Sequence, residues 1–474
     1  MAQAKTTFLA KLTYGFGAVA YGVKNNGFDY FLLIFYSQIL GVDAGLVGLA
    51  LLIALVFDAF SDPIVGYLSD NTRGRLGRRH PWMYAAAIPV AIGYYLLWSP
   101  PSDLAGNSLF LYLLGISIFV RTLITFYEVP SSALAAEISR DYNERTSLMA
   151  WRSFFGWTAG ILIAAYTLVV TLAPSEANPD GVFNRAGFRT YGLIASILIF
   201  SSIMIASLGT QNLVPSLPKA PEKERKSLGK IVSEIVETLK FKSFFAVFLA
   251  TILAAIATGL SMSLNLYLNT YFWGLAPEQI SVLILSVLVG ALLSLILAPL
   301  LSRTWGKKKA SIICASLILF LSPVLICLRL AGLLPENGDP ILFPILVGVA
   351  IVEMTLTITV QILMMSMIAD LVEQNELRTG RRSEGVFFAT ITFTRKATQG
   401  LGVWAASLVL VVASFPKGAT PDQVPQAGVD TLASLYVPAI LILWILKILA
   451  ILMYRIDRQQ HEANLAEIEA TIAH

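Results

Sequence analysis

The chain alternates between long apolar runs and short polar segments. A helix needs roughly 20 apolar residues to cross a bilayer core, and twelve runs reach that length. Six of them precede a charged segment at 212–242, and six follow it. The predicted spans are 10–38, 44–69, 82–100, 107–137, 147–172, 189–209, 243–272, 277–302, 310–332, 342–371, 385–414 and 431–454. The pattern predicts an all-α polytopic membrane protein with twelve transmembrane helices in two six-helix bundles.

Composition supports this prediction. The 474 residues are 56% hydrophobic and 14% charged, whereas soluble domains carry about 25% charged residues. Both cysteines, Cys314 and Cys327, lie in apolar runs, so no disulfide framework is expected. The N-terminal segment lacks the pattern of a cleaved signal peptide.

Basic residues indicate the orientation of the spans. Loops that follow spans 1, 3, 7 and 9 contain no Lys or Arg, and the loops after spans 5 and 11 contain few. The even-numbered loops carry Arg73, Arg75, Arg78, Arg79, Arg140, Arg145, Lys219, Lys223, Arg225, Lys226, Lys230, Arg303, Lys307, Lys308, Lys309, Arg378, Arg381 and Arg382. Because cytoplasmic loops are enriched in Lys and Arg, we expect both termini in the cytoplasm and the chain in the plasma (inner) membrane.

This orientation fits a division of the chain into four parts. We expect an N-terminal bundle at 1–211, a cytoplasmic linker at 212–242, a C-terminal bundle at 243–455 and a cytoplasmic tail at 456–474.

The two halves show a faint internal duplication. Pro63 ends span 2 before a basic loop, and Pro299 ends span 8 before a second basic loop, 236 positions later (299 − 63). Parallel repeats about an axis along the membrane normal are the build of major facilitator transporters. At this offset the counterparts of Asp58 and Asp62 are Ser294 and Ala298, so the acid pair belongs to the first half only.

Charged side chains inside predicted spans are the main candidates for function. Such residues are costly in lipid and usually face a bundle interior or a cavity. They are Lys24, Asp29, Asp58, Asp62, Arg121, Glu128, Arg152, Glu353, Arg395 and Lys396.

The stretch FDAFSDP places two of these acids on one helix face. Asp58 and Asp62 are four residues apart, with Ser61 beside them. Two neighbouring carboxylates repel unless a cation bridges them or one takes up a proton. This predicts a cation site with Asp58 and Asp62 as ligands of a metal cation such as Na⁺, or as proton acceptors. The alternative is a structural ion-pair cluster with Lys24 or Arg152.

The following segment, GYLSDNTRGRLGRRHPW, contains Asp70, Arg73, Arg78 and Arg79. The arginines serve orientation by the positive-inside rule. We also expect Asp70 and these arginines to form an inter-helix latch that gates the cytoplasmic side.

Several motifs occur in the order found in one transporter family. They are KLTYGFGA, VGLALLIALVFDAFSDP, FYEVPSSALAAEISRDYNERTSLMAWR, MIADLVEQNELRTGRRSEGVFFATITFTRKATQGLG and YRIDRQQH. The chain resembles the glycoside–pentoside–hexuronide:cation symporters, typified by the melibiose carriers, over nearly its whole length. This resemblance implies the major facilitator fold and transport coupled to Na⁺, H⁺ or Li⁺.

The resemblance also implies roles for single residues. Asp58 and Asp62 match the acidic cation ligands, Ser61 stands at an asparagine ligand, and Thr125 lies beside the site. Glu128 stands where the melibiose carriers bind sugar with an aspartate, and the basic residues that match the cavity lining are Arg152 and Lys396.

Three positions depart from the melibiose pattern. A sugar-binding acid is replaced by Gly22, and two cavity tryptophans are replaced by Ser132 and Gln361. Other side chains could contact a solute instead, or could be ordinary packing residues: Tyr21, Asn25, Asn26 and Tyr127. Lys24 could replace the coupling cation, but its helical position favours a role in the cavity or as the partner of an acid.

We therefore expect a monomeric secondary transporter that couples Na⁺ or H⁺ to uptake of a sugar, glycoside or related polar solute by alternating access. Its expected partners are the solute and membrane lipid, without nucleic acid and without a cofactor beyond the coupling ion. A lysophospholipid symporter of the same fold and a non-transporting sensor are the alternatives. A membrane-embedded enzyme is not expected, because His80, His461 and His474 all lie outside the spans and no P-loop is present.

Overall fold

A computed structural model describes residues 7–139, 142–176, 181–216, 242–379 and 384–454, almost all of them helical. The N-terminal half contains α1 (Phe8–Phe16), α2 (Val19–Asn26), α3 (Leu32–Ile34), α4 (Ala44–Asn71), α5 (His80–Trp98), α6 (Gly106–Ile138), α7 (Tyr142–Tyr166) and α8 (Arg185–Gln211). The C-terminal half contains α10 (Lys242–Tyr267), α11 (Pro277–Trp305), α12 (Lys307–Leu330), α13 (Leu342–Thr379), α14 (Glu384–Val412) and α15 (Gln426–Leu452).

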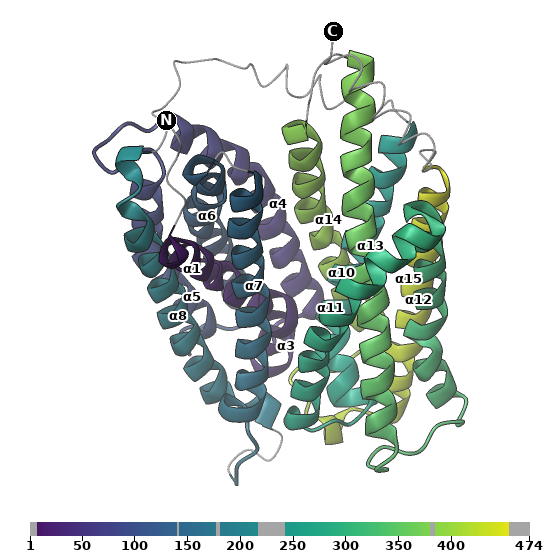
Figure 1. The fold of residues 1–474 in the computed structure, drawn as a ribbon. Coiled ribbons are helices and arrows are strands. Elements are labelled where there is room, and N and C mark those ends of the chain that lie inside the picture. Colours follow the sequence, from purple (N-terminus) through teal and green to yellow (C-terminus); the bar gives the residue numbers. More distant parts are fainter. Residues whose placement is uncertain (1–6, 140–141, 177–180, 217–241, 380–383, 455–474) are drawn as a thin grey trace.

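The helices form two bundles that stand side by side (Figure 1). Across the boundary between the bundles, α4 packs against α14 and α7 packs against α11. We call the end that carries the 72–79 loop and the start of α12 the basic end, and the other end the opposite end. The ribbons of the two bundles lie farther apart at the basic end than at the opposite end (Figure 1). The predicted linker and tail fall largely at 217–241 and 455–474, outside the described residues, so those boundaries stay predictions.

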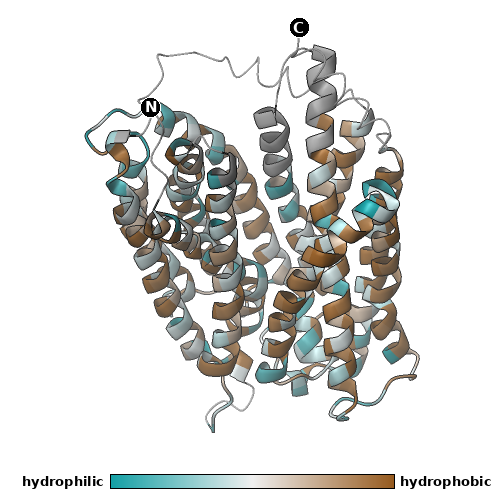
Figure 2. Cartoon of the chain, in the orientation of Figure 1, coloured by the Kyte–Doolittle hydropathy of each residue, from teal (hydrophilic) through white to brown (hydrophobic). Residues whose placement is uncertain are grey.

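Lipid-facing composition agrees with the twelve predicted spans. Hydrophobic residues cover the middle of the bundles (Figure 2), and large side chains such as Ile296 and Phe320 are 71% and 73% exposed. Within the described ranges, nine helices are long and apolar enough to cross a membrane. Three predicted spans, 10–38, 82–100 and 385–414, are not among these nine, and the first of them is divided into short helices. With nine such helices, the chain is a multi-pass membrane protein.

The first span is a broken helix. After α1 and α2, π-helical turns at Gly27–Phe31 and Phe35–Ile39 flank the short α3. Before the break, α2 approaches α7 closely at Gly22, where a Cβ would lie 2.0 Å from the backbone oxygen of Gly156. Only a glycine permits the two helices to approach so closely.

The duplication extends to local geometry. The π turn Phe35–Ile39 precedes Gly41 at φ 73°, and the π turn Leu268–Phe272 precedes Gly274 at φ 60°. These glycines stand 233 positions apart (274 − 41), and their left-handed backbone suits glycine. At this offset Asp58 corresponds to Ala291, so the acid still has no counterpart in the second half.

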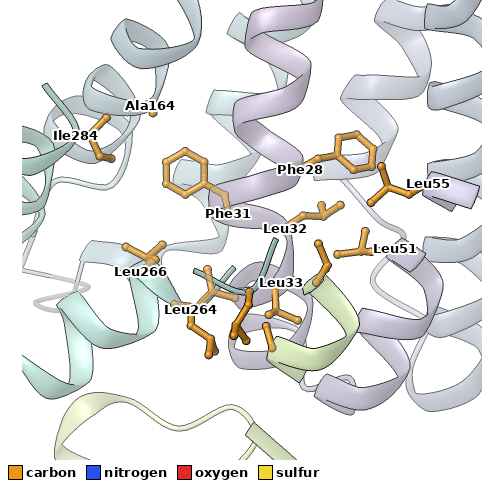
Figure 3. Packing of buried hydrophobic residues seen from close by; sticks show 14 of the residues in the cluster. Phe28, Phe31, Leu32, Leu33, Leu51, Leu55, Ala164, Leu264, Leu266 and Ile284 are labelled. Atoms are coloured by element: carbon orange, nitrogen blue, oxygen red, sulfur yellow. The ribbon is translucent and has the colours of Figure 1, made fainter. Parts of the chain in front are cut away.

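Contacts between the bundles close the opposite end. Buried leucines and phenylalanines of both halves meet there, including Phe31, Leu32 and Leu33 near Leu264 and Leu266 (Figure 3). Polar contacts add to this packing. The Ser37 hydroxyl hydrogen-bonds the Tyr267 hydroxyl, the Ala419 amide donates to the Gln38 side chain at 3.3 Å, and the Lys417 ammonium lies 2.7 Å from the Asp43 carboxylate.

Candidate functional site

The acid pair lies at mid-depth in α4. The Asp58 side chain is 2% exposed and the Asp62 side chain 21% exposed. Thr125 of α6 places its hydroxyl 2.9 Å from Asp58 Oδ1 and 3.2 Å from Asp62 Oδ1. Pro63 follows directly, and proline leaves one carbonyl of the preceding turn without its helical hydrogen bond. The cluster therefore gathers two carboxylates and one hydroxyl, which are hard oxygen donors suited to an alkali cation.

Lys396 of α14 reaches this cluster from the other bundle. Its Nζ lies 2.7 Å from Asp62 Oδ2, 3.7 Å from Asp58 Oδ2 and 4.0 Å from Glu128 Oε1. One ammonium of the C-terminal half thus faces three carboxylates of the N-terminal half.

Arg121 is the second positive group at the acid pair. Its Nη1 lies 3.5 Å from Asp58 Oδ2, and its guanidinium stacks 4.4 Å from the centre of the Phe28 ring. The sequence marked Arg121 as an intramembrane charge but gave it no role. Its position one helical turn before Thr125 was the available signal, because i and i+4 residues share a helix face. The structural alternative named the wrong bases: the neutralising groups are Lys396 and Arg121, not Lys24 and Arg152.

Glu128 lies beside the acid pair and joins it to a second polar group. Lys24 Nζ, 2% exposed as a side chain, lies 3.9 Å from Glu128 Oε2. Arg152 donates to Ser131 Oγ at 3.0 Å and to the Glu128 backbone carbonyl at 3.4 Å. The structure thus places Lys24 against Glu128 and gives it no contact with the acid pair among the described ion pairs.

Tyr21 and Arg152 contact each other twice. The Arg152 guanidinium lies 5.0 Å from the Tyr21 ring centre, and the Tyr21 hydroxyl donates to the Arg152 carbonyl at 3.3 Å. Together with Glu128 and Lys24, they form a polar cluster that we call the Glu128 cluster.

Other predicted site residues lie differently. The Ser61 hydroxyl donates to the Asp58 carbonyl at 2.9 Å, so its proton is used within its own helix. Ser132 and Gln361 are exposed, and Ser132 donates to the Val129 carbonyl at 2.8 Å. Gly22 is buried against α7, where packing already accounts for the glycine.

The two asparagines of α2 are half-buried. The Asn26 amide donates weakly to the Gly22 carbonyl at 3.4 Å, and its Oδ1 is a buried acceptor without a hydrogen-bond partner in the described part of the chain. Asn25 has intermediate exposure one residue earlier. Buried acceptors of this kind are costly unless a partner is supplied.

The predicted latch is an ion cluster within the N-terminal bundle. Arg79 forms an ion pair with Asp70, and its Nε donates to Glu137 Oε1 at 2.7 Å. Arg78 Nη2 lies 3.0 Å from the same Glu137 oxygen. Arg73 is exposed and lies outside this cluster in the part of the chain that the structure describes. Sequence reasoning missed Glu137, although an acid in ALAAE at the end of an apolar helix was a visible signal.

Comparison with known families shows to which family the chain belongs. The family described as MFS/sugar transport protein matches residues 13–458. The chain belongs to this family. This membership agrees with the major facilitator fold that the sequence predicted.

Curated relatives agree with the resemblance to glycoside–pentoside–hexuronide:cation symporters. The chain is 35% identical over 220 residues to an uncharacterized symporter, sll1374, of Synechocystis sp., covering 45% of this chain and 40% of that protein. It is 32% identical over 162 residues to the putative glycoside/cation symporter YagG of Escherichia coli, covering 34% of this chain and 35% of the relative. It is 31% identical over 174 residues to the sodium-dependent lysophosphatidylcholine symporter 1 of Gallus gallus, covering 36% of this chain and 33% of that protein. These matches span less than half the length of each relative.

A solved structure supports the fold. The nucleoside transporter NupG superposes with a TM-score of 0.62 at 14% identity, covering 94% of this chain and 100% of that one. At this identity the similarity concerns the fold alone.

Proposed function

We propose that the protein is a cation-coupled symporter of a polar solute, with a sugar or glycoside as the solute class and Na⁺ or H⁺ as the coupling ion. The observation that carries the proposal is the contact of Lys396, on one bundle, with Asp58 and Asp62 on the other. A charge contact across the bundle boundary joins the cation site to the relative position of the two bundles. Alternating access requires such a link, because the bundles rock around a midplane site.

Competition for the acid pair is the proposed coupling step. A bound Na⁺ would be held by Asp58, Asp62 and Thr125, and it would share the two carboxylates with the Lys396 ammonium. Protonation of one carboxyl would weaken the same contact by removing its charge. Either event frees Lys396 to move toward Glu128, whose Oε1 lies 4.0 Å away.

The Glu128 cluster is the proposed solute site. Glu128 accepts hydrogen bonds from hydroxyls, Arg152 donates them, and Tyr21 offers an aromatic face. Asn26 adds a buried acceptor that lacks a partner in the described structure. Because Lys396 lies between this cluster and the acid pair, cation binding changes the charge that the solute meets. By linkage, the solute must then change cation affinity by the same factor.

The positive-inside pattern places the basic end in the cytoplasm. With that orientation, the packed opposite end faces outward and the structure corresponds to an inward-facing state. Both termini would then be cytoplasmic. We also propose that the transporter lies in the plasma (inner) membrane and acts as a monomer.

A lysophospholipid is the second candidate solute. The sodium-dependent lysophosphatidylcholine symporter of Gallus gallus matches 36% of this chain. A zwitterionic headgroup would find both signs of charge in Glu128, Lys24 and Arg152, whereas its acyl chain would need an apolar path between the bundles.

The test is a thermal-shift screen of the purified full chain against sugars, glycosides, uronates and lysophosphatidylcholine, each with and without Na⁺. We expect a polar glycoside or uronate to raise the melting temperature, and Na⁺ to increase that shift. If lysophosphatidylcholine is the only compound that raises the melting temperature, it replaces a sugar or glycoside as the proposed solute. A sensor would show the same binding without flux in proteoliposomes.

Two variants locate the site. Glu128→Gln should weaken binding of the identified solute by at least tenfold and should weaken Na⁺ binding less. Asp62→Asn should abolish the increase in the melting-temperature shift that Na⁺ causes. Asp103→Asn, an exposed loop acid, is the matched control. If Glu128→Gln leaves solute affinity unchanged, the solute is not bound at the Glu128 cluster.

A further inference from the structure

The C-terminal bundle contains an intramembrane acid that the transport site does not use. Glu353 lies eleven residues after the start of α13 at Leu342, which is about 16 Å along the helix axis at 1.5 Å per residue. This position is near the middle of a bilayer core of about 30 Å. The acids of the cation site, in contrast, belong to the N-terminal bundle.

The polar neighbours of Glu353 are hydroxyl groups from two other helices. Ser322 of α12 and Tyr436 of α15 are polar neighbours of the Glu353 carboxyl. Tyr436 is 6% exposed, and its hydroxyl also lies 3.1 Å from Ser261 Oγ of α10. We call Glu353, Ser322, Tyr436 and Ser261, four polar side chains of the C-terminal bundle, the Glu353 cluster.

Positive groups of the surrounding helices lie elsewhere. Arg395 and Lys396 of α14 act on acids of the N-terminal bundle, and Lys447 of α15 lies 4.1 Å from the centre of the Trp444 ring. α11 packs on α13 through Gly290, against Met354 and Thr355. Apart from Lys447, the charged residues of α11, α12 and α15 stand at or near the helix ends: Glu278, Arg303, Lys307, Lys308, Lys309, Arg329 and Asp430. Among the described residues, Tyr436 is the titratable group that faces Glu353, and no ion pair involves this acid.

A carboxylate at this depth without a positive partner is strongly disfavoured. A carboxyl group that keeps its proton avoids this cost and can donate a hydrogen bond to a hydroxyl. Glu353, Ser322 and Ser261 each keep intermediate accessibility.

We propose that Glu353 is a proton-binding site of the C-terminal bundle, separate from the cation site at Asp58 and Asp62. Loss of this proton creates an unpaired charge between α10, α12, α13 and α15. The packing of these four helices therefore depends on the protonation of Glu353, and the site makes the C-terminal bundle sensitive to alkaline pH.

Infrared spectroscopy of the purified full chain tests the proposal without a solute. The protonated carboxyl C=O band is recorded in H₂O and D₂O at neutral pH for the wild type, Glu353→Gln and Glu336→Gln. Gln keeps the shape of a protonated Glu, and Glu336 is an acid of the 331–341 loop. We expect the wild-type minus Glu353→Gln difference to show a protonated carboxyl band, and the wild-type minus Glu336→Gln difference to show none.

Thermal stability gives a second measurement. A folded state that binds one more proton than the unfolded chain loses stability as pH rises. The melting temperature of the wild type should therefore fall relative to that of Glu353→Gln between neutral and alkaline pH. A band difference of zero at neutral pH, or parallel melting curves for the two proteins, would overturn the proposal. Neither readout depends on Asp58 or Asp62. If the Glu353 proposal fails, the proposed symport is therefore unaffected.

Discussion

At the residue scale, Lys396 connects the cation site with the solute site. It lies 2.7 Å from Asp62 and 4.0 Å from Glu128, so it can respond to either ligand. The sequence predicted a basic residue of the cavity at this position from resemblance. It could not show that the ammonium would contact the acid pair, because α4 and α14 are more than 300 positions apart and their register depends on the fold.

Lys396→Gln should separate cation binding from solute binding. Without the ammonium, the acid pair still offers its oxygens to Na⁺, so Na⁺ binding should persist. The ratio of solute affinities at high and low Na⁺ should fall toward one, from the roughly 5–150-fold factor that coupled sites typically show. Isothermal titration of solute at low and high Na⁺ measures this factor. An unchanged factor would mean that Lys396 does not carry the coupling.

At the element scale, the close approach of α2 and α7 depends on Gly22. Gly22→Ala places a Cβ 2.0 Å from the Gly156 carbonyl oxygen, and one of the two helices must shift. We expect a loss of several degrees in melting temperature. Gly115→Ala in α6, where a Cβ would meet no atom within 4 Å, should be neutral or stabilising by up to about 1 kcal/mol. Equal melting temperatures for the two variants would contradict the packing explanation.

The ion cluster formed by α4, the 72–79 loop and α6 leads to a second prediction at this scale. Arg79→Gln leaves the 6%-exposed Glu137 side chain with Arg78 as its remaining partner. Breaking a buried ion pair costs about 3–5 kcal/mol. We therefore expect a clear fall in melting temperature.

Arg73→Gln, at an exposed position, is the matched control and should change stability by less than about 0.5 kcal/mol. In the double variant Arg79→Gln with Glu137→Gln, part of the loss should be recovered. Additive losses would show that the two side chains act independently.

The helices were largely predictable and their breaks were not. Apolar runs located the spans to within a few residues, because bilayer thickness fixes helix length. The π turns at Gly27–Phe31 and Phe35–Ile39 left no sign in the hydropathy pattern. Glu137 was missed because its partner Arg79 lies in the 72–79 loop directly before α5, and the pairing required the packing of α5 on α6.

At the scale of the whole molecule, the opposite end is closed by contacts between the bundles. The Asp43–Lys417 ion pair is the exposed part of this closure. The Lys417 ammonium lowers the pKa of the Asp43 carboxyl, so the pair is intact at neutral pH and is lost as pH falls below the ordinary value of about 3.9. Between pH 5 and 8 the contribution of this pair should be constant.

Asp43→Asn should shift the population toward states open at the opposite end. Distances between spin labels placed across that end measure this shift, and Lys417→Arg, which keeps the charge, should resemble the wild type. A distance distribution identical to that of the wild type would show that the apolar packing alone closes this end. A variant effect that varies between pH 5 and 8 would show that another group titrates there.

The central claim is that the acid pair of α4 couples cation flow to solute transport. The most direct measurement is uptake of the solute found in the screen by proteoliposomes under an imposed Na⁺ gradient, an imposed proton gradient and no gradient. We predict accumulation above equilibrium by the wild type with one of the two gradients, and by Asp58→Asn and Asp62→Asn with neither. Accumulation by both variants at the wild-type level, or mere equilibration by the wild type under both gradients, would contradict the account.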